Sequence, residues 1–243
     1  MRWVFPETGL EQFELSIPYS PNTCVVILTV SDYSHRLIGS EIAEAGRMKP
    51  LRKNAFSSGR YAVHLAQNEL GLAPSEILAE GRRPIWPSGQ VGAITHSNDF
   101  AAAIVSCDLL SVGLDIERLG RIKEKLYHKF FTAAELTLIS QMPGSEVESI
   151  LFSGKESVYK AIYFIVQRYV NFQEVELVLK PENSSLSLNN IAKNMATNKT
   201  IKKNAKKYAT TIRKNNQKYK EIEDPYRGYR QIRKAMLNTG IYV

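Results

Sequence analysis

A predicted long helix with charged residues at its centre constrains this chain more than any other feature. Apolar residues fill most of positions 150–168, at a spacing and over a length that favour a helix. Glu156 and Lys160 interrupt them and lie four residues apart, so they share one helix face. The simplest interpretation is a surface ion pair that contributes roughly 0.3 kcal/mol. Two acidic residues further upstream raise the possibility of a functional site.

These two acidic residues are Asp115 and Glu117. Residues 111–117 have the pattern of a strand, in which alternate side chains point to opposite faces. The two carboxylates would then share one face, while Leu114 and Ile116 point into the core. Two carboxylates on a strand and a third on a nearby helix form the kind of oxygen site that Mg²⁺ prefers. An isolated D-x-E pattern is also common on exposed strands, so both interpretations remain open.

The bulk composition indicates a globular protein. The chain has 243 residues, of which 44% are hydrophobic and 23% charged, and this length suits one large domain or two small ones. The longest apolar run near the start, residues 24–28, is too short to span a bilayer, and residues 1–7 lack the apolar core of a signal peptide. Cys24 and Cys107 have neither metal-binding spacing nor a disulfide framework. We therefore expect a cytoplasmic protein with no membrane span.

The positive charge is concentrated in the last quarter of the chain. Residues 181–243 contain 14 Lys and Arg against 4 Asp and Glu, whereas residues 1–180 contain 18 against 20. Asn and Lys dominate after Pro181, and hydrophobic periodicity fades. Such an asymmetry is typical of a nucleic-acid-binding tail or of a disordered one.

The remaining elements are predicted from local patterns. A helix over residues 56–70 would be capped by Ser57 or Ser58 and ended by Gly71. Two prolines and two glycines predict irregular structure over residues 72–90, with Trp86 packed down between Pro84 and Pro87. Strands are predicted over residues 23–31, 91–97, 100–107 and 174–180, the third of them central, and a capping box at Thr132–Glu135 predicts a helix to about residue 141.

Several basic residues could bind phosphate groups. Arginine matches phosphate geometry with two parallel donors, and Arg52, Lys53, Arg60, Arg82 and Arg83 are candidates. Taken alone, they are better explained as surface charge. A single histidine, here His96, is more often a structural hydrogen-bonding residue than a catalyst. The chain contains no P-loop, no Rossmann glycine pattern and no zinc-ligand spacing.

Taken in order, five segments of the chain resemble the motifs of one family. They are Gly59-Arg60, then PIWP at residues 84–87, GAITHS at 92–97, GLDIE at 113–117 and FSGKESVYKA at 152–161. The chain resembles 4'-phosphopantetheinyl transferases of the surfactin type, most closely the enterobactin synthase component D subgroup, over roughly residues 40–180. The resemblance implies an α+β fold with two pseudo-symmetric lobes. Each lobe would pack a small, mainly antiparallel sheet on a long helix, with the cofactor in the cleft between them.

The resemblance also implies an activity. The family transfers the 4'-phosphopantetheine group of coenzyme A to a serine of an apo acyl or peptidyl carrier protein, and it releases adenosine 3',5'-bisphosphate. The carrier would belong to a non-ribosomal peptide, polyketide or fatty-acid synthase, siderophore biosynthesis being one such pathway. We expect a monomeric enzyme with no nucleic-acid partner.

The site residues follow from the matching motifs. Implied metal ligands for Mg²⁺ are Asp115, Glu117 and Glu156. Glu156 would also activate the attacking serine, and Lys160 would stabilise the leaving phosphate, so these two are the catalytic pair. The implied coenzyme A ligands are Arg60, Arg83, Thr95, His96, Lys155 and Lys160. Glu135 is left out, because its capping box accounts for it.

The resemblance is weaker at both ends of the chain. We expect an N-terminal lobe over residues 1–111, a C-terminal lobe with the metal site over 112–180, and a basic tail over 181–243 that is atypical for the family. Related enzymes continue after the long helix with further strands, whereas here an Asn/Lys-rich sequence replaces them. Two alternatives therefore stay open: a nucleic-acid-binding protein that acts through its tail, and an inactive remnant that binds coenzyme A without transferring anything.

Overall fold

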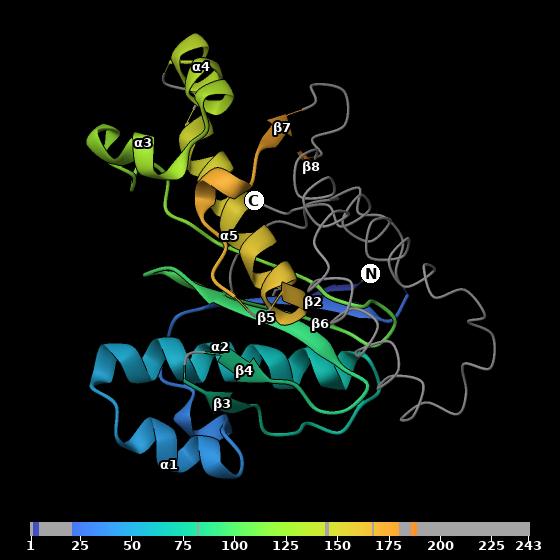
Figure 1. Cartoon of the computed structure of the whole chain (residues 1–243). Coiled ribbons are helices and arrows are strands. Elements are labelled where there is room, and N and C mark those ends of the chain that lie inside the picture. The colour runs from blue at the N-terminus through green and yellow to red at the C-terminus, as the bar shows by residue number, and fades with distance from the viewer. Residues whose placement is uncertain are drawn as a thin grey trace, which may run out of the picture. The chain divides into compact units, whose positions relative to one another are not determined.

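The computed structural model describes residues 2–4, 21–81, 83–143, 146–166, 168–179 and 186–188. The chain divides into two compact units, Met1–Ile116 and Glu117–Val243. Both units combine helices with short, mainly antiparallel strands (Figure 1). The protein is therefore a mixture of helices and small sheets, compatible with the predicted α+β class.

The first unit is built around a four-stranded sheet in the order β1-β2-β6-β5. β1 (Arg2–Val4) runs parallel to β2 (Thr23–Thr29), and β6 (Phe100–Ser106) pairs antiparallel with both β2 and β5 (Val91–His96). The predicted strands at 23–31, 91–97 and 100–107 are confirmed. β6 is central as predicted, and burial of every residue from Ala101 to Val105 explains why its sequence is apolar throughout.

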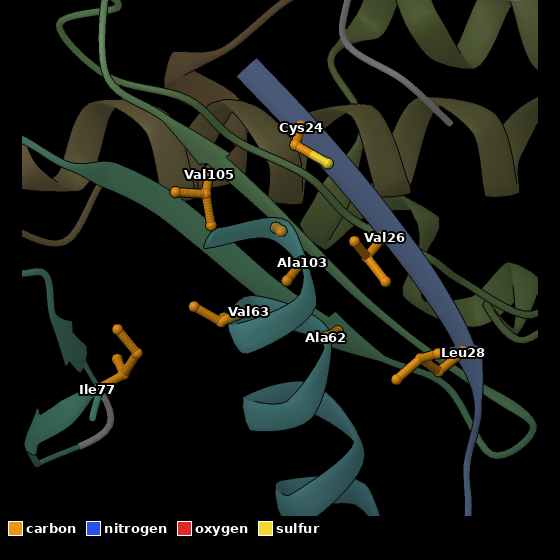
Figure 2. Packing of buried hydrophobic residues seen from close by; sticks show 9 residues of the cluster. Cys24, Val26, Leu28, Ala62, Val63, Ile77, Ala103 and Val105 are labelled. Carbon is orange, nitrogen blue, oxygen red and sulfur yellow. The ribbon is translucent and has the colours of Figure 1, made fainter. Parts of the chain in front are cut away.

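The core of the first unit lies between this sheet and helix α2 (Pro50–Glu69), which runs along one sheet face (Figure 1). Figure 2 shows how alternate residues of β2 and β6 face small side chains of the helix, as the two-residue period of a strand requires. Alanine and valine on α2 let the helix backbone approach the sheet closely. The buried cluster comprises Cys24, Val26, Leu28, Ala62, Val63, Ala66, Ile77, Ala103 and Val105.

Helix α2 begins six residues before its predicted start. Pro50 occupies the first helical turn, where a preset φ and a missing amide proton are favourable. Ser57 and Ser58 are therefore not caps: their hydroxyls accept the amides of Tyr33 and Ser31 at 3.1 and 3.0 Å. The predicted end is confirmed, because Gly71 has a φ of +75° and directly follows Leu70, the C-cap residue of α2.

The segment that precedes α2 is also helical. η1 (Ser34–Arg36) and α1 (Ser40–Gly46) follow β2, and α1 packs against α2. Leu37, Ala45 and Phe56 form a second small buried cluster there, with Met48 against it.

The prediction of irregular structure over residues 72–90 is wrong in part. β3 (Leu78–Glu80) and β4 (Arg83–Ile85) form an antiparallel hairpin, in which Pro84 is paired with Ala79. Both strands of a two-stranded hairpin are edge strands, and an edge strand tolerates a proline, which has no amide proton to donate. Trp86 packs against the core as predicted, and a Cβ on Gly92 would lie 2.3 Å from its ring.

The second unit contains α3 (Tyr127–Phe130), α4 (Ala133–Gln141) and α5 (Val147–Val166), with short helices η2 (Glu124–Leu126) and η3 (Phe172–Glu174). The capping box is confirmed: Thr132 accepts the Glu135 amide and Glu135 accepts the Thr132 amide. α5 begins three residues before its predicted start. The predicted strand at 174–180 is shorter, since only β7 (Leu177–Leu179) is extended.

β7 pairs antiparallel with β8 (Leu186–Leu188), which lies beyond Pro181. A strand is thus present where the sequence predicts that the basic tail replaces the lobe. The rest of the predicted tail, residues 189–243, lies outside the described residues, and so do residues 181–185.

Candidate active site

The segment that carries Asp115 is not the predicted strand. None of the described residues between β6 and η2 is in a strand. Leu114 and Asp115 are both buried, so the expected alternation of core and surface side chains is absent. Thr95, near the end of β5, provides the reason. Its Oγ1 donates to Asp115 Oδ1 at 2.9 Å and accepts the amide of Ile116 at 3.3 Å, so a side chain replaces the partner strand.

This contact joins two of the predicted site motifs within the first unit. Thr95 belongs to the predicted coenzyme A ligands, and Asp115 to the predicted metal ligands. Asp115 is only 7% exposed, and a buried carboxylate needs compensating hydrogen bonds or positive charge. The Thr95 hydroxyl supplies part of that compensation.

His96, the next residue of β5, is exposed and contacts α2. Arg52 Nη1 lies 3.3 Å from His96 Nε2. The sequence identified Arg52 only as one of several basic residues. A better signal was available, because Arg52, Phe56 and Arg60 follow one another at four-residue intervals and therefore share one face of α2.

Arg60, the third residue of that face, is buried. Its guanidinium carbon lies 4.7 Å from the centre of the Phe56 ring, and its Nε lies 3.7 Å from Glu41 Oε1. Burial lowers the pKa of Arg60, whereas the charges of Glu41 and Glu44 raise it. Arg83, by contrast, is partly exposed on β4 and forms an ion pair with Glu80 across the hairpin turn.

The second unit holds the other two predicted metal ligands. The Glu117 side chain is 7% exposed; its Oε1 accepts the amide of Arg118 at 2.7 Å, and its Oε2 accepts from Arg121 Nη1 at 2.5 Å. Glu156 and Lys160 lie one turn apart on α5 and are half-buried. Burial raises the pKa of the neighbouring Tyr159, and the charges of Tyr163 and Glu156 raise it further.

Lys155, predicted to bind coenzyme A, is buried in the second unit. This side chain is 1% exposed, and its ammonium contacts three acceptors: Glu135 Oε2 at 2.5 Å, the Phe130 carbonyl at 2.8 Å and the Phe172 carbonyl at 3.0 Å. An ammonium has three protons, so these contacts satisfy it. These contacts make Lys155 a structural residue of the second unit. Burial lowers its pKa, although Glu135 acts in the opposite direction.

The three predicted metal ligands are divided between the units: Asp115 belongs to the first, and Glu117 and Glu156 to the second. Over the part of the chain that the structure describes, no group of three or more His, Cys, Asp or Glu side chains is gathered as a metal site. The donor set itself consists of carboxylates, two of them nearly buried, which is the chemistry that Mg²⁺ favours.

Comparison with known proteins assigns both units to one class. The model of the 4'-phosphopantetheinyl transferase N-terminal domain matches residues 41–106, and that of the 4'-phosphopantetheinyl transferase superfamily matches residues 111–213. The chain belongs to the 4'-phosphopantetheinyl transferase superfamily. The second match extends past residue 180, where the sequence resemblance was expected to end.

Individual relatives agree with this assignment. The chain is 34% identical over 154 residues to 4'-phosphopantetheinyl transferase Svp of Streptomyces mobaraensis. The aligned segment covers 60% of this chain and 62% of that protein. It is 28% identical to 4'-phosphopantetheinyl transferase PptT of Mycobacterium tuberculosis, over 55% of this chain and 61% of the relative. Enterobactin synthase component D of Escherichia coli K12 is 26% identical over 61% of this chain and 75% of its own length.

The chain thus spans less than two thirds of the length of the first two of these relatives.

A further finding concerns the hydropathy of the helices. Across the residues that the structure describes, every helix is too short or too polar to cross a membrane.

Proposed function

We propose that this protein transfers the 4'-phosphopantetheine group of coenzyme A to a serine of an apo carrier protein and releases adenosine 3',5'-bisphosphate. The observation that supports this best is the Thr95–Asp115 hydrogen bond at 2.9 Å. It links the motif that would bind coenzyme A phosphates to the motif that would bind the metal. Relatives named 4'-phosphopantetheinyl transferase support the same reaction.

Mg²⁺ would be held by Asp115, Glu117 and Glu156, whose carboxylates are the ligands that this ion prefers. When bound, the ion would neutralise charge on the pyrophosphate of coenzyme A. We further propose that the protein has two lobes of similar construction and that the cofactor binds in the cleft between them.

The protein's own side chains would divide the remaining work. Arg60, Thr95 and His96, with Arg83 at the hairpin, would bind phosphate groups of coenzyme A, and Arg52 would join them because it contacts His96. Lys160, one turn after Glu156, would stabilise the leaving phosphate. Glu156 would accept the proton of the attacking serine, directly or through a water.

The carrier protein would come from a non-ribosomal peptide, polyketide or fatty-acid synthase. The relatives named enterobactin synthase component D favour a siderophore pathway and a place for this chain in that subgroup.

Chromatography of the nucleotide product tests the reaction. The protein, coenzyme A, Mg²⁺ and an apo carrier protein should together release adenosine 3',5'-bisphosphate, and a chelator should stop the release. If coenzyme A binds but none of several apo carrier proteins elicits release, the protein is the inactive remnant. Salt-sensitive binding to DNA or RNA, without coenzyme A binding, would instead favour the nucleic-acid-binding alternative.

A further inference from the structure

One buried carboxylate in the first unit has no role in the site described so far. Glu41, in the first turn of α1, is 1% exposed. Its Oε1 accepts the amide of Ile77 at 2.9 Å, and its Oε2 accepts the amide of Ile38 at 3.3 Å. Because each oxygen is bound to a different backbone segment, the carboxylate has a fixed position and orientation.

Two basic side chains of α2 face this carboxylate. Arg60 Nε lies 3.7 Å from Glu41 Oε1, and His64 Nε2 lies 3.2 Å from Glu41 Oε2. Both nitrogens are buried, and neither has a hydrogen-bond partner among the described residues. Arg60 and His64 are four residues apart, so one face of α2 presents both to Glu41.

The geometry of Arg60 is unusual for a structural arginine. Its side chain is 9% exposed, and the guanidinium is stacked on Phe56. Guanidinium groups carry five N–H donors, and the Nε donor of this one is buried without a hydrogen-bond partner among the described residues. Leaving a buried donor unpaired is costly, more so for a charged group. An anion bound by the guanidinium would balance its positive charge.

We propose that Glu41 is the positioning residue for Arg60: it balances the guanidinium charge from the Nε side and directs the remaining donors toward the anionic groups of coenzyme A. This inference rests on the proposed function. Glu41 itself would not contact coenzyme A and acts through Arg60. The stack on Phe56 restrains the guanidinium plane, and Glu41 restrains its direction within that plane.

A purely structural role for Glu41 is the competing explanation, since it also holds the backbone at Ile38 and Ile77. The two explanations differ in one respect. If Glu41 acts through Arg60, its replacement must weaken coenzyme A binding only when Arg60 is present. If Glu41 acts only through the backbone, the loss must be the same with and without Arg60.

Calorimetric titration of the full-length chain with coenzyme A separates them. We expect Glu41→Gln to weaken binding by about tenfold, and by less than about twofold when Arg60→Gln is already present. The matched control is Glu76→Gln. Glu76 accepts the backbone amide and hydroxyl of Ser40, both at 2.7 Å, so it also anchors α1, and these hydrogen bonds do not involve Arg60. This control should bind coenzyme A as the unaltered chain does.

Each other outcome is decisive. Equal losses in both backgrounds, or no loss from Glu41→Gln, would overturn the inference, and thermal melts would show that all variants are folded. Failure of transfer with coenzyme A binding intact would reject the proposed function alone and leave the positioning role measured. If the unaltered chain does not bind coenzyme A, both are rejected.

Discussion

Thr95 Oγ1 donates to Asp115 Oδ1 at 2.9 Å and accepts the amide of Ile116 at 3.3 Å. The Thr95 hydroxyl thus binds both the Asp115 carboxylate and the backbone amide of the next residue, Ile116. Replacing it should therefore affect both stability and metal affinity.

We expect Thr95→Val to cost about 1–3 kcal/mol of unfolding free energy, because it leaves a buried carboxylate and a partly buried amide with one partner fewer. The Mg²⁺ concentration for half-maximal transfer should also rise. Thr95→Ser, which keeps the hydroxyl, is the control and should restore most of both properties. A Val variant with unchanged stability and metal response would show that the hydroxyl is dispensable.

Removal of the Lys155 ammonium should destabilise the second unit. Lys155→Met leaves the Glu135 carboxylate buried without its charge partner, which typically costs about 3–5 kcal/mol. Denaturant unfolding measures the loss. Arg168→Met is the control, since Arg168 pairs with Glu174 at the surface and its loss should cost no more than about 1 kcal/mol. Similar costs for both variants would contradict the structural role of Lys155.

A methyl group at Gly92 should not fit. The added Cβ would lie 2.3 Å from the Trp86 ring and 2.5 Å from the Ile104 carbonyl oxygen, so Gly92→Ala should cost about 1–3 kcal/mol. Gly46→Ala, at the end of α1, meets no atom within 4 Å and should be neutral or slightly stabilising. Trp86 fluorescence and thermal melts would follow both variants, and a harmless Gly92→Ala would refute this packing.

Acid should weaken the Arg168–Glu174 ion pair. The hydrogen bond from Arg168 holds the pKa of Glu174 below its ordinary value of 4.5. A lowered carboxylate pKa stabilises the folded protein above the ordinary value, and this stabilisation is lost as the pH falls through the folded-state pKa. Glu174→Gln should therefore melt below the unaltered chain at pH 7, and the gap should close in acid. A gap that is constant with pH would contradict the assignment.

Local signals in the sequence predicted local structure well. The capping box at Thr132 and Glu135 predicted the start of α4, and the apolar patterns at residues 91–97 and 100–107 predicted strands β5 and β6. Each of these signals acts over a few residues and needs no knowledge of the rest of the fold.

Errors arose where a distant contact determines the outcome. Ser57 and Ser58 resemble helix caps, yet they bind the backbone at Ser31 and Tyr33. Residues 111–117 have strand-like composition, but Thr95 takes the place of a partner strand. The contacts of Lys155 with Glu135 and with two distant carbonyls likewise could not be predicted from the motif that contains it.

The mass of an apo carrier protein, measured after incubation with this protein, coenzyme A and Mg²⁺, tests the central claim most directly. We predict a gain of about 340 Da, the mass of the transferred phosphopantetheine group, and no gain when Asp115→Ala replaces the unaltered chain. A constant carrier mass with non-ribosomal peptide, polyketide and fatty-acid carriers alike, or an undiminished gain with Asp115→Ala, would contradict the account.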